Sequence, residues 1–161
     1  MHSGFKIDIP LTARYILCSL KHHVGDAYIV GGCVRDSLLG KQPHDWDICT
    51  SAKPGAVLET MAEHGVKTIE TGLKHGTVTA IISDENYEIT TFRVDGEYSD
   101  NRRPDSVEFV CDIIEDLSRR DFTINAMASS ILGAVMAIWM LSLSAVSATL
   151  TIDSEKTLCE S

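Results

Sequence analysis

Two aspartates, Asp45 and Asp47, are separated by one residue in the segment HDWDICT. If residues 45–50 form a strand, alternation places both carboxylates on one face and turns Trp46 and Ile48 toward a core. Like charges this close repel each other unless a cation lies between them, and carboxylate oxygens are the ligands that Mg²⁺ prefers. We therefore expect Asp45 and Asp47 to be metal ligands. The alternative is a solvated strand edge.

A pair of glycines precedes these aspartates. Gly31 and Gly32 follow a β-rich apolar run at 27–30 and lead into a predicted helix over 33–39. Glycines let the backbone approach a ligand closely, and a helix N-terminus presents free N–H groups to an anion. Arg35 adds a guanidinium suited to phosphate oxygens. The segment predicts a phosphate-binding turn, and the alternative is an ordinary turn followed by a surface arginine.

A third carboxylate lies further along the chain. In the predicted strand over 87–93, alternation puts Glu88 on the face opposite Ile89. If this strand neighbours the strand over 45–50, Glu88 is a third ligand for the same metal. Otherwise it faces solvent.

Two adjacent arginines, Arg119 and Arg120, follow in the segment DLSRRDFTINA. We expect them at the entrance of a helix, where Asp121 can act as the N-cap. Their charge suits a triphosphate, and the alternative is a solvated helix face.

These residues must be positioned by elements that the pattern also predicts. We expect helices over 10–22 and 54–64, strands over 66–70, 77–82 and 107–111, a turn at 84–86, and mainly helix over 112–128. In the first helix, Leu11, Tyr15, Ile16 and Leu20 are spaced for one buried face. Strands interleaved with helices predict an α+β fold with a mixed β-sheet of four or five strands flanked by helices.

Charge and cysteine content limit the class of protein. Fourteen Lys and Arg against 23 Asp and Glu give a net charge of −9, which argues against nucleic-acid binding through bulk charge and leaves room for a local basic site. The five cysteines are odd in number and form no CxxC pair, so neither a disulfide framework nor a structural zinc site fits. The first residues, MHSGFKIDIP, lack the apolar run of a secretory signal. We expect a reduced, cytoplasmic setting.

The chain changes character after residue 128. From 122 to 152 it contains no charged side chain, and 131–150 is mostly apolar. About 20 apolar residues are long enough to cross a bilayer, but serines dilute this run. We expect a domain over 1–128 and an apolar C-terminal helix or tail over 129–161.

Four segments together resemble a known family. IVGGCVRDSLLG, HDWDICTS, ITTFRVDGEYSDNRRPDSVEFV and DLSRRDFTINAMA are similar, in order and spacing, to the catalytic head of tRNA nucleotidyltransferases, the CCA-adding enzymes grouped with bacterial poly(A) polymerases. The resemblance implies a nucleotidyltransferase head of the DNA polymerase beta type. It also implies that the 3′-hydroxyl of tRNA attacks the α-phosphate of CTP or ATP, with Mg²⁺ as cofactor.

The resemblance also implies roles for individual positions. The metal ligands would be Asp45, Asp47 and Glu88, the first two being catalytic. The nucleotide would be bound by Gly31, Gly32, Arg35, Asp36, Arg119, Arg120, Asp121 and Asn125.

The chain departs from the family after Ala128. Family members continue into a neck domain that selects the base and into further domains that hold tRNA, and residues 129–161 resemble neither. We expect a truncated member. The alternative is a non-catalytic remnant whose apolar tail mediates association or membrane contact.

Overall fold

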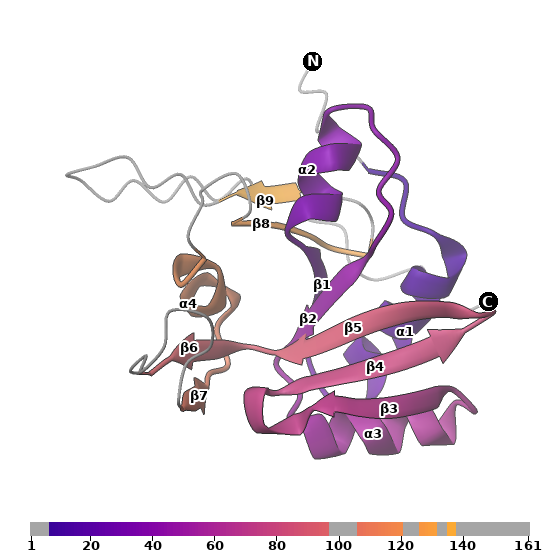
Figure 1. Cartoon of the computed structure of the whole chain (residues 1–161), viewed down its shortest axis with the longest axis vertical. Coiled ribbons are helices and arrows are strands. Elements are labelled where there is room, and N and C mark those ends of the chain that lie inside the picture. Colours follow the sequence, from indigo (N-terminus) through magenta and orange to yellow (C-terminus); the bar gives the residue numbers. More distant parts are fainter. Residues whose placement is uncertain (1–6, 97–105, 121–125, 132–134, 138–161) are drawn as a thin grey trace.

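The computed structural model describes residues 7–96, 106–120, 126–131 and 135–137 of the 161-residue chain. Within these ranges helices and strands are interleaved along the sequence (Figure 1). The elements are α1 (Leu11–His23), β1 (Ala27–Val30), α2 (Gly32–Leu38), β2 (Asp47–Thr50), α3 (Pro54–Glu63), β3 (Lys67–Gly72), the 3₁₀ helix η1 (Leu73–His75), β4 (Thr77–Ile82), β5 (Glu85–Thr91), β6 (Arg93–Asp95), β7 (Val107–Phe109), α4 (Ile113–Ser118), β8 (Met127–Ser129) and β9 (Val135–Ala137). The predicted α+β class is confirmed.

One mixed sheet contains most of these strands. In the described part of the chain it has seven strands in the order β3-β4-β5-β2-β1-β8-β9. β2 and β5 run parallel, and all the other neighbours run antiparallel. β6 and β7 pair separately. The mixed sheet is as predicted, but it is wider than the expected four or five strands because β8 and β9 extend it beyond β1.

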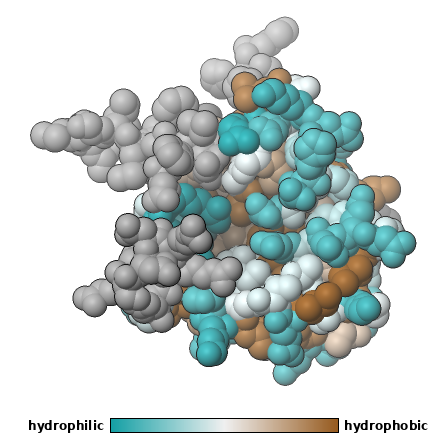
Figure 2. All heavy atoms as spheres, viewed as in Figure 1, coloured by the Kyte–Doolittle hydropathy of each residue, from teal (hydrophilic) through white to brown (hydrophobic). Residues whose placement is uncertain are grey.

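The main hydrophobic core lies between this sheet and helices α1 and α3, which lie behind β3, β4 and β5 in Figure 1. Ile16 of α1 and Met61 of α3 are fully buried, as are Ile48 of β2 and Ile89 of β5. Burying each such side chain contributes about 1.5–3 kcal/mol. The opposite face of β3–β5 is turned to the viewer. Its surface is of intermediate to high hydrophobicity, with hydrophilic side chains in between (Figure 2).

A smaller hydrophobic cluster lies beside α4. It joins Leu117 of α4 to Val30 of β1, Cys49 of β2 and Phe92, which follows β5. Along β2, Ile48 belongs to the main core and the next residue, Cys49, to this smaller cluster, as strand alternation requires. The cluster therefore holds the C-terminal end of α4 against β1 and β2.

The predicted buried face of the first helix is partly wrong. Leu11 and Tyr15 are 84% and 46% exposed, whereas Ile16 and Leu20 are buried. The buried stripe is instead Ala13, Ile16, Leu17 and Leu20, spaced i, i+3, i+4 and i+7. At 3.6 residues per turn, Leu11 and Tyr15 lie on the face of α1 opposite that stripe, so they point away from the sheet.

Several other element boundaries also differ from the prediction; the strand predicted over 87–93, for example, is β5 at Glu85–Thr91, and Arg93 begins the separate strand β6. β2 begins at Asp47, so Asp45 lies outside the strand. The turn between β4 and β5 is Ser83-Asp84, both with positive φ, because Ile82 pairs directly with Glu85. The stretch 112–128, predicted to be mainly helical, contains only the six-residue α4 and the start of β8 in its described part. Pairing of β8 with β1 overrides the local helical pattern there.

The residues after 128 are described only in part. β9 falls within the predicted apolar tail and pairs with β8, so this portion is a strand rather than a helix. The rest of the predicted helix or tail, from 138 onward, lies outside the described residues. Among the helices that the structure describes, none has the length and apolar character needed to span a membrane. The domain boundary at 128 stays a prediction.

Candidate active site

Asp47 and Asp45 lie at the N-terminal end of β2. Asp47 is the first residue of the strand, and both aspartates are exposed. Trp46 packs partly buried against the main core, and Ile48 is buried in it. These two side chains point into the protein and the carboxylates point out, although the strand is shorter than predicted.

The position of Glu88 follows from the parallel pairing of β2 with β5. In this register Ile48 pairs with Ile89, which places Glu88, in the middle of β5, next to Asp47 at the start of β2. Glu88 is exposed. The condition stated for a third carboxylate, that the two strands be neighbours, is therefore met.

Burial and three nearby charges affect the carboxyl of Asp47. Burial raises the pKa of the Asp47 carboxyl above its ordinary value, Glu88 and Asp45 raise it further, and Arg120 acts in the opposite direction. Asp47 is exposed as a whole residue, yet neighbouring protein atoms shield its carboxyl from part of the solvent. Three carboxylates thus repel each other at one place, and one guanidinium offsets part of that repulsion.

The donors at this place suit a divalent cation. In the described ranges, no group of three or more His, Cys, Asp or Glu side chains is already arranged to hold a metal ion. The chemistry of the donors nevertheless fits Mg²⁺, because Asp45, Asp47 and Glu88 offer hard carboxylate oxygens. Their mutual repulsion at Asp47 is what a bound cation would relieve. The residues present therefore fit the ion.

Gly31 joins the glycine turn to these carboxylates. It precedes α2 with φ +81° and ψ −139°, a backbone conformation that side chains larger than hydrogen rarely adopt. A Cβ atom placed on Gly31 would lie 3.6 Å from Nη1 of Arg120 and 3.9 Å from Oδ2 of Asp47. The backbone at Gly31, the carboxylate of Asp47 and the guanidinium of Arg120 therefore meet at one point.

Arg35 and Asp36, on α2, pair with each other. Nη2 of Arg35 lies 2.8 Å from Oδ1 of Asp36, and Nε donates to the same oxygen at 2.8 Å. The hydrogen bond from Arg35 lowers the pKa of Asp36, and the positive charge of Lys41 acts in the same direction. Asp36 therefore orients the guanidinium whose contact with phosphate the sequence predicts.

Arg119 and Arg120 lie at the C-terminal end of α4. Arg119 is the C-cap of α4, and Arg120 follows it. α4 ends at Ser118, and the helix that the two arginines were expected to enter would begin outside the described residues, so that expectation stays a prediction. Asp121 and Asn125, predicted to contact the nucleotide, lie outside the described residues.

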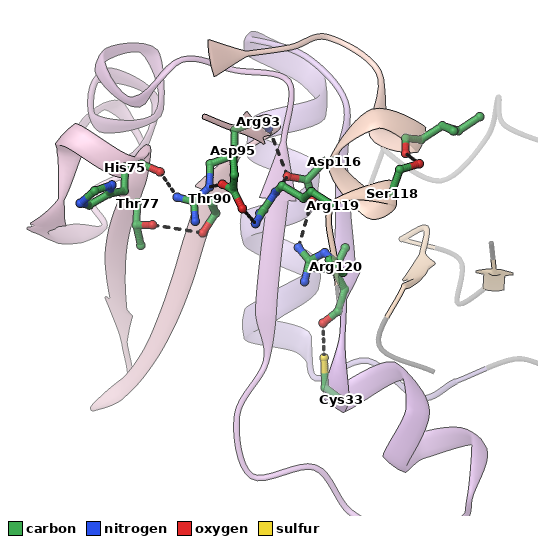
Figure 3. A network of polar contacts seen from close by, with 12 residues as sticks. Cys33, His75, Thr77, Thr90, Arg93, Asp95, Asp116, Ser118, Arg119 and Arg120 are labelled. Carbon is green, nitrogen blue, oxygen red and sulfur yellow. Dashed lines mark hydrogen bonds and ion pairs between the residues drawn. The ribbon is translucent and has the colours of Figure 1, made fainter. Parts of the chain in front are cut away.

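A buried carboxylate that the sequence reasoning missed holds both arginines. The side chain of Asp116 is 0% exposed. It lies 3.0 Å from Nη2 of Arg119 and 3.1 Å from Nη2 of Arg120 (Figure 3). The signal was present in the spacing, since an aspartate three and four residues before two arginines on a helix places all three on one face.

Solved structures of a CCA-adding enzyme and of a tRNA nucleotidyltransferase are similar to this chain. The crystal structure of the Bacillus stearothermophilus CCA-adding enzyme in complex with CTP matches with a TM-score of 0.69 and 45% identity, covering 79% of this chain and 29% of that one. A tRNA nucleotidyltransferase complexed with a primer tRNA and an incoming ATP analog matches with a TM-score of 0.51 and 34% identity, covering 71% of this chain and 31% of that one.

Curated relatives and a family model agree with the structural match. The CCA-adding enzyme of Lactobacillus helveticus is 50% identical over 129 residues, which are 80% of this chain and 31% of the relative. That of Lactobacillus delbrueckii subsp. bulgaricus is 54% identical over 124 residues, 77% of this chain and 30% of the relative. The chain thus spans less than a third of the length of these relatives.

The fold and the motifs define the class as nucleotidyltransferase heads, as the sequence resemblance predicts. Residues 27–138 match the model of the Poly A polymerase head domain, and the chain belongs to this family.

Proposed function

We propose that this chain is the catalytic head of a tRNA nucleotidyltransferase that transfers CMP or AMP from CTP or ATP to the 3′-hydroxyl of tRNA. The observation that carries the proposal is the meeting of Gly31, Asp47 and Arg120 at one point. A ligand can approach the backbone of Gly31 closely, the carboxylate of Asp47 can bind a metal ion, and the guanidinium of Arg120 is positively charged. Together these three groups suit a triphosphate that is bound through a metal ion. The proposed acceptor, tRNA, follows from the similar tRNA nucleotidyltransferase, which was solved in complex with a primer tRNA.

Asp45, Asp47 and Glu88 would hold Mg²⁺. Bound there, Mg²⁺ would lower the pKa of the attacking hydroxyl and neutralise charge on the transferring phosphate. The bond that forms joins the 3′-oxygen to the α-phosphorus, and the bond that breaks releases pyrophosphate. Catalysis of this kind is positioning and charge stabilisation, so loss of either aspartate should nearly abolish it.

The remaining residues of the site would bind the nucleotide. Gly31 and Gly32 let the triphosphate approach the backbone, and Arg35, oriented by Asp36, pairs with its oxygens. Arg120 adds positive charge beside Asp47. We assign Arg119, Asp121 and Asn125 to the same function on the resemblance of the segment DLSRRDFTINA. The cysteine pattern supports a cytoplasmic location.

The test is Mg²⁺-dependent binding of CTP and ATP to the full chain, measured by isothermal titration calorimetry. The double variant Asp45→Ala/Asp47→Ala should lose saturable binding. Glu59→Ala/Glu63→Ala removes the same charge from the exposed side of α3 and should bind as the wild type does. Equal affinity for UTP and GTP would mean that the site binds the phosphates and selects no base. A folded, monomeric sample without binding would overturn the proposal and favour the non-catalytic remnant.

A further inference from the structure

Asp116 is at the centre of a network of three arginines and two aspartates (Figure 3). Oδ1 of Asp116 accepts hydrogen bonds from the backbone N–H of Arg93 at 3.1 Å and from Nε of Arg119 at 3.0 Å. Oδ2 accepts one from Nη2 of Arg120 at 3.1 Å. Both oxygens of one fully buried carboxylate are therefore engaged by donors from two segments of the chain.

The two arginines at the end of α4 are held differently. Arg119 contacts a second carboxylate, since its Nη1 lies 3.4 Å from Oδ2 of Asp95. Asp95 also lies 3.3 Å from Nε of Arg93. Arg119 is thus placed between two carboxylates and links α4 to β6.

Arg120 has one nitrogen on Asp116 and another directed at the site. Its Nη2 is bound to Asp116, while its Nη1 is the atom that would lie 3.6 Å from a Cβ on Gly31. The guanidinium is planar and rigid, so fixing one nitrogen fixes the direction of the other. The positive charge of Arg120 also reaches Asp47.

We propose that Asp116 is a positioning residue that aims the guanidinium of Arg120 at the space beside Gly31 and Asp47, where the proposed function places the triphosphate. Asp116 touches neither nucleotide nor metal and acts through Arg120. This inference rests on the proposed function for the identity of the anion. The geometry of the Asp116–Arg120 pair stands independently of it.

If Asp116 acts only through its charge, replacing it by asparagine changes the affinity for CTP in one direction, and if it positions Arg120 the affinity changes in the other. Removing a negative charge near a bound triphosphate should, by Coulomb's law alone, strengthen anion binding. If Asp116 aims Arg120, Asp116→Asn should instead weaken Mg²⁺–CTP binding about tenfold, the size of one lost charge-assisted hydrogen bond. Glu115→Gln removes the same charge from an exposed position of α4, one residue before Asp116. It should leave CTP affinity unchanged or slightly increased.

The experiment combines CTP titration with NMR of arginine side chains in the full chain. The Nε–Hε signal of Arg120, assigned by its loss in Arg120→Gln, should be well dispersed in the wild type and in Glu115→Gln. In Asp116→Asn this signal should move to the chemical shift that is typical of mobile arginine side chains. In the Arg120→Gln background, Asp116→Asn should cause no further loss of affinity. A folded Asp116→Asn variant with an unchanged Arg120 signal, or with tighter CTP binding, would overturn the proposal.

A second variant covers the case in which Asp116→Asn fails to fold. Arg120→Lys keeps the charge at a side chain that is 21% exposed, but its single nitrogen cannot bond Asp116 and face the site together. It should weaken CTP binding as much as Arg120→Gln, and wild-type affinity would contradict positioning. If the wild type binds no CTP while the Arg120 signal depends on Asp116, the positioning stands and the proposed function falls.

Discussion

Ile48 and Ile89 pair across parallel strands, and this register brings Glu88 beside Asp47. Forty-one positions separate the two acidic residues in the sequence, so local pattern could not place them together. Both isoleucines are buried in the main core, which makes the register hard to shift. A slip by one residue would turn each of them to the opposite face. The core therefore determines which carboxylates meet.

Glu88→Gln should separate metal binding from stability. Losing a ligand should weaken Mg²⁺ binding in the presence of CTP by roughly tenfold or more. Without metal the fold should become slightly more stable, because the repulsion that raises the pKa of Asp47 is reduced. Metal titration and urea unfolding measure the two effects. Glu70→Gln, on the exposed edge strand β3, should change neither. A Glu88→Gln variant with wild-type Mg²⁺ affinity would exclude Glu88 as a ligand.

Gly31→Ala should destabilise the fold by about 1–3 kcal/mol, because alanine must adopt the strained backbone that glycine accepts. The space itself is adequate, since the new Cβ would make ordinary contacts with Arg120 and Asp47. Gly32→Ala, one residue later inside α2, should be neutral or stabilising by up to about 1 kcal/mol. Urea unfolding compares the two variants. Equal stabilities would show that the positive φ of Gly31 is not required.

Arg35→Gln should weaken Mg²⁺–CTP binding by roughly tenfold, because one charge-assisted contact to phosphate is lost. Pyrophosphate should lose affinity by the same factor if Arg35 holds the phosphates that leave. Competition titration measures both ligands. Arg14→Gln removes the same charge from α1, where Arg14 pairs with Asp8, and serves as the control. If the affinity for CTP falls and the affinity for pyrophosphate does not, Arg35 does not contact the phosphates that leave.

Cys33 should make the fold less stable at alkaline pH. Burial raises the pKa of the Cys33 thiol to about 11. In the unfolded chain a cysteine has a pKa of about 8.5, so that state loses its proton first as the pH rises. Stability is therefore complete below about pH 8.5 and falls toward pH 11, by up to about 3 kcal/mol.

Unfolding at pH 8 and pH 10.5 tests this, with Cys33→Ala as the comparison. The variant should lose less stability than the wild type over that interval. Its lost packing costs the same at both pH values, so the difference between the two proteins isolates the thiol. Parallel loss in both proteins would contradict the prediction.

Local patterns in the sequence determined the elements and the chemistry-bearing residues. Periodicity placed α1, α3 and β4 nearly at their observed bounds, and the two glycines marked the turn into α2. These features depend on side chains a few residues apart, which interact within one helix or strand. The same holds for the alternation around Asp47, where Trp46 and Ile48 turn inward.

The tertiary structure decided what these residues do together. It paired β2 with β5, which brought Glu88 to Asp47, and it paired β8 with β1 in a stretch whose local pattern favours helix. It also buried Asp116 between Arg119 and Arg120, so that one of the two adjacent arginines faces Asp47. Strand order and buried ion pairs depend on contacts between distant segments, whose free energy is gained only when the whole core assembles.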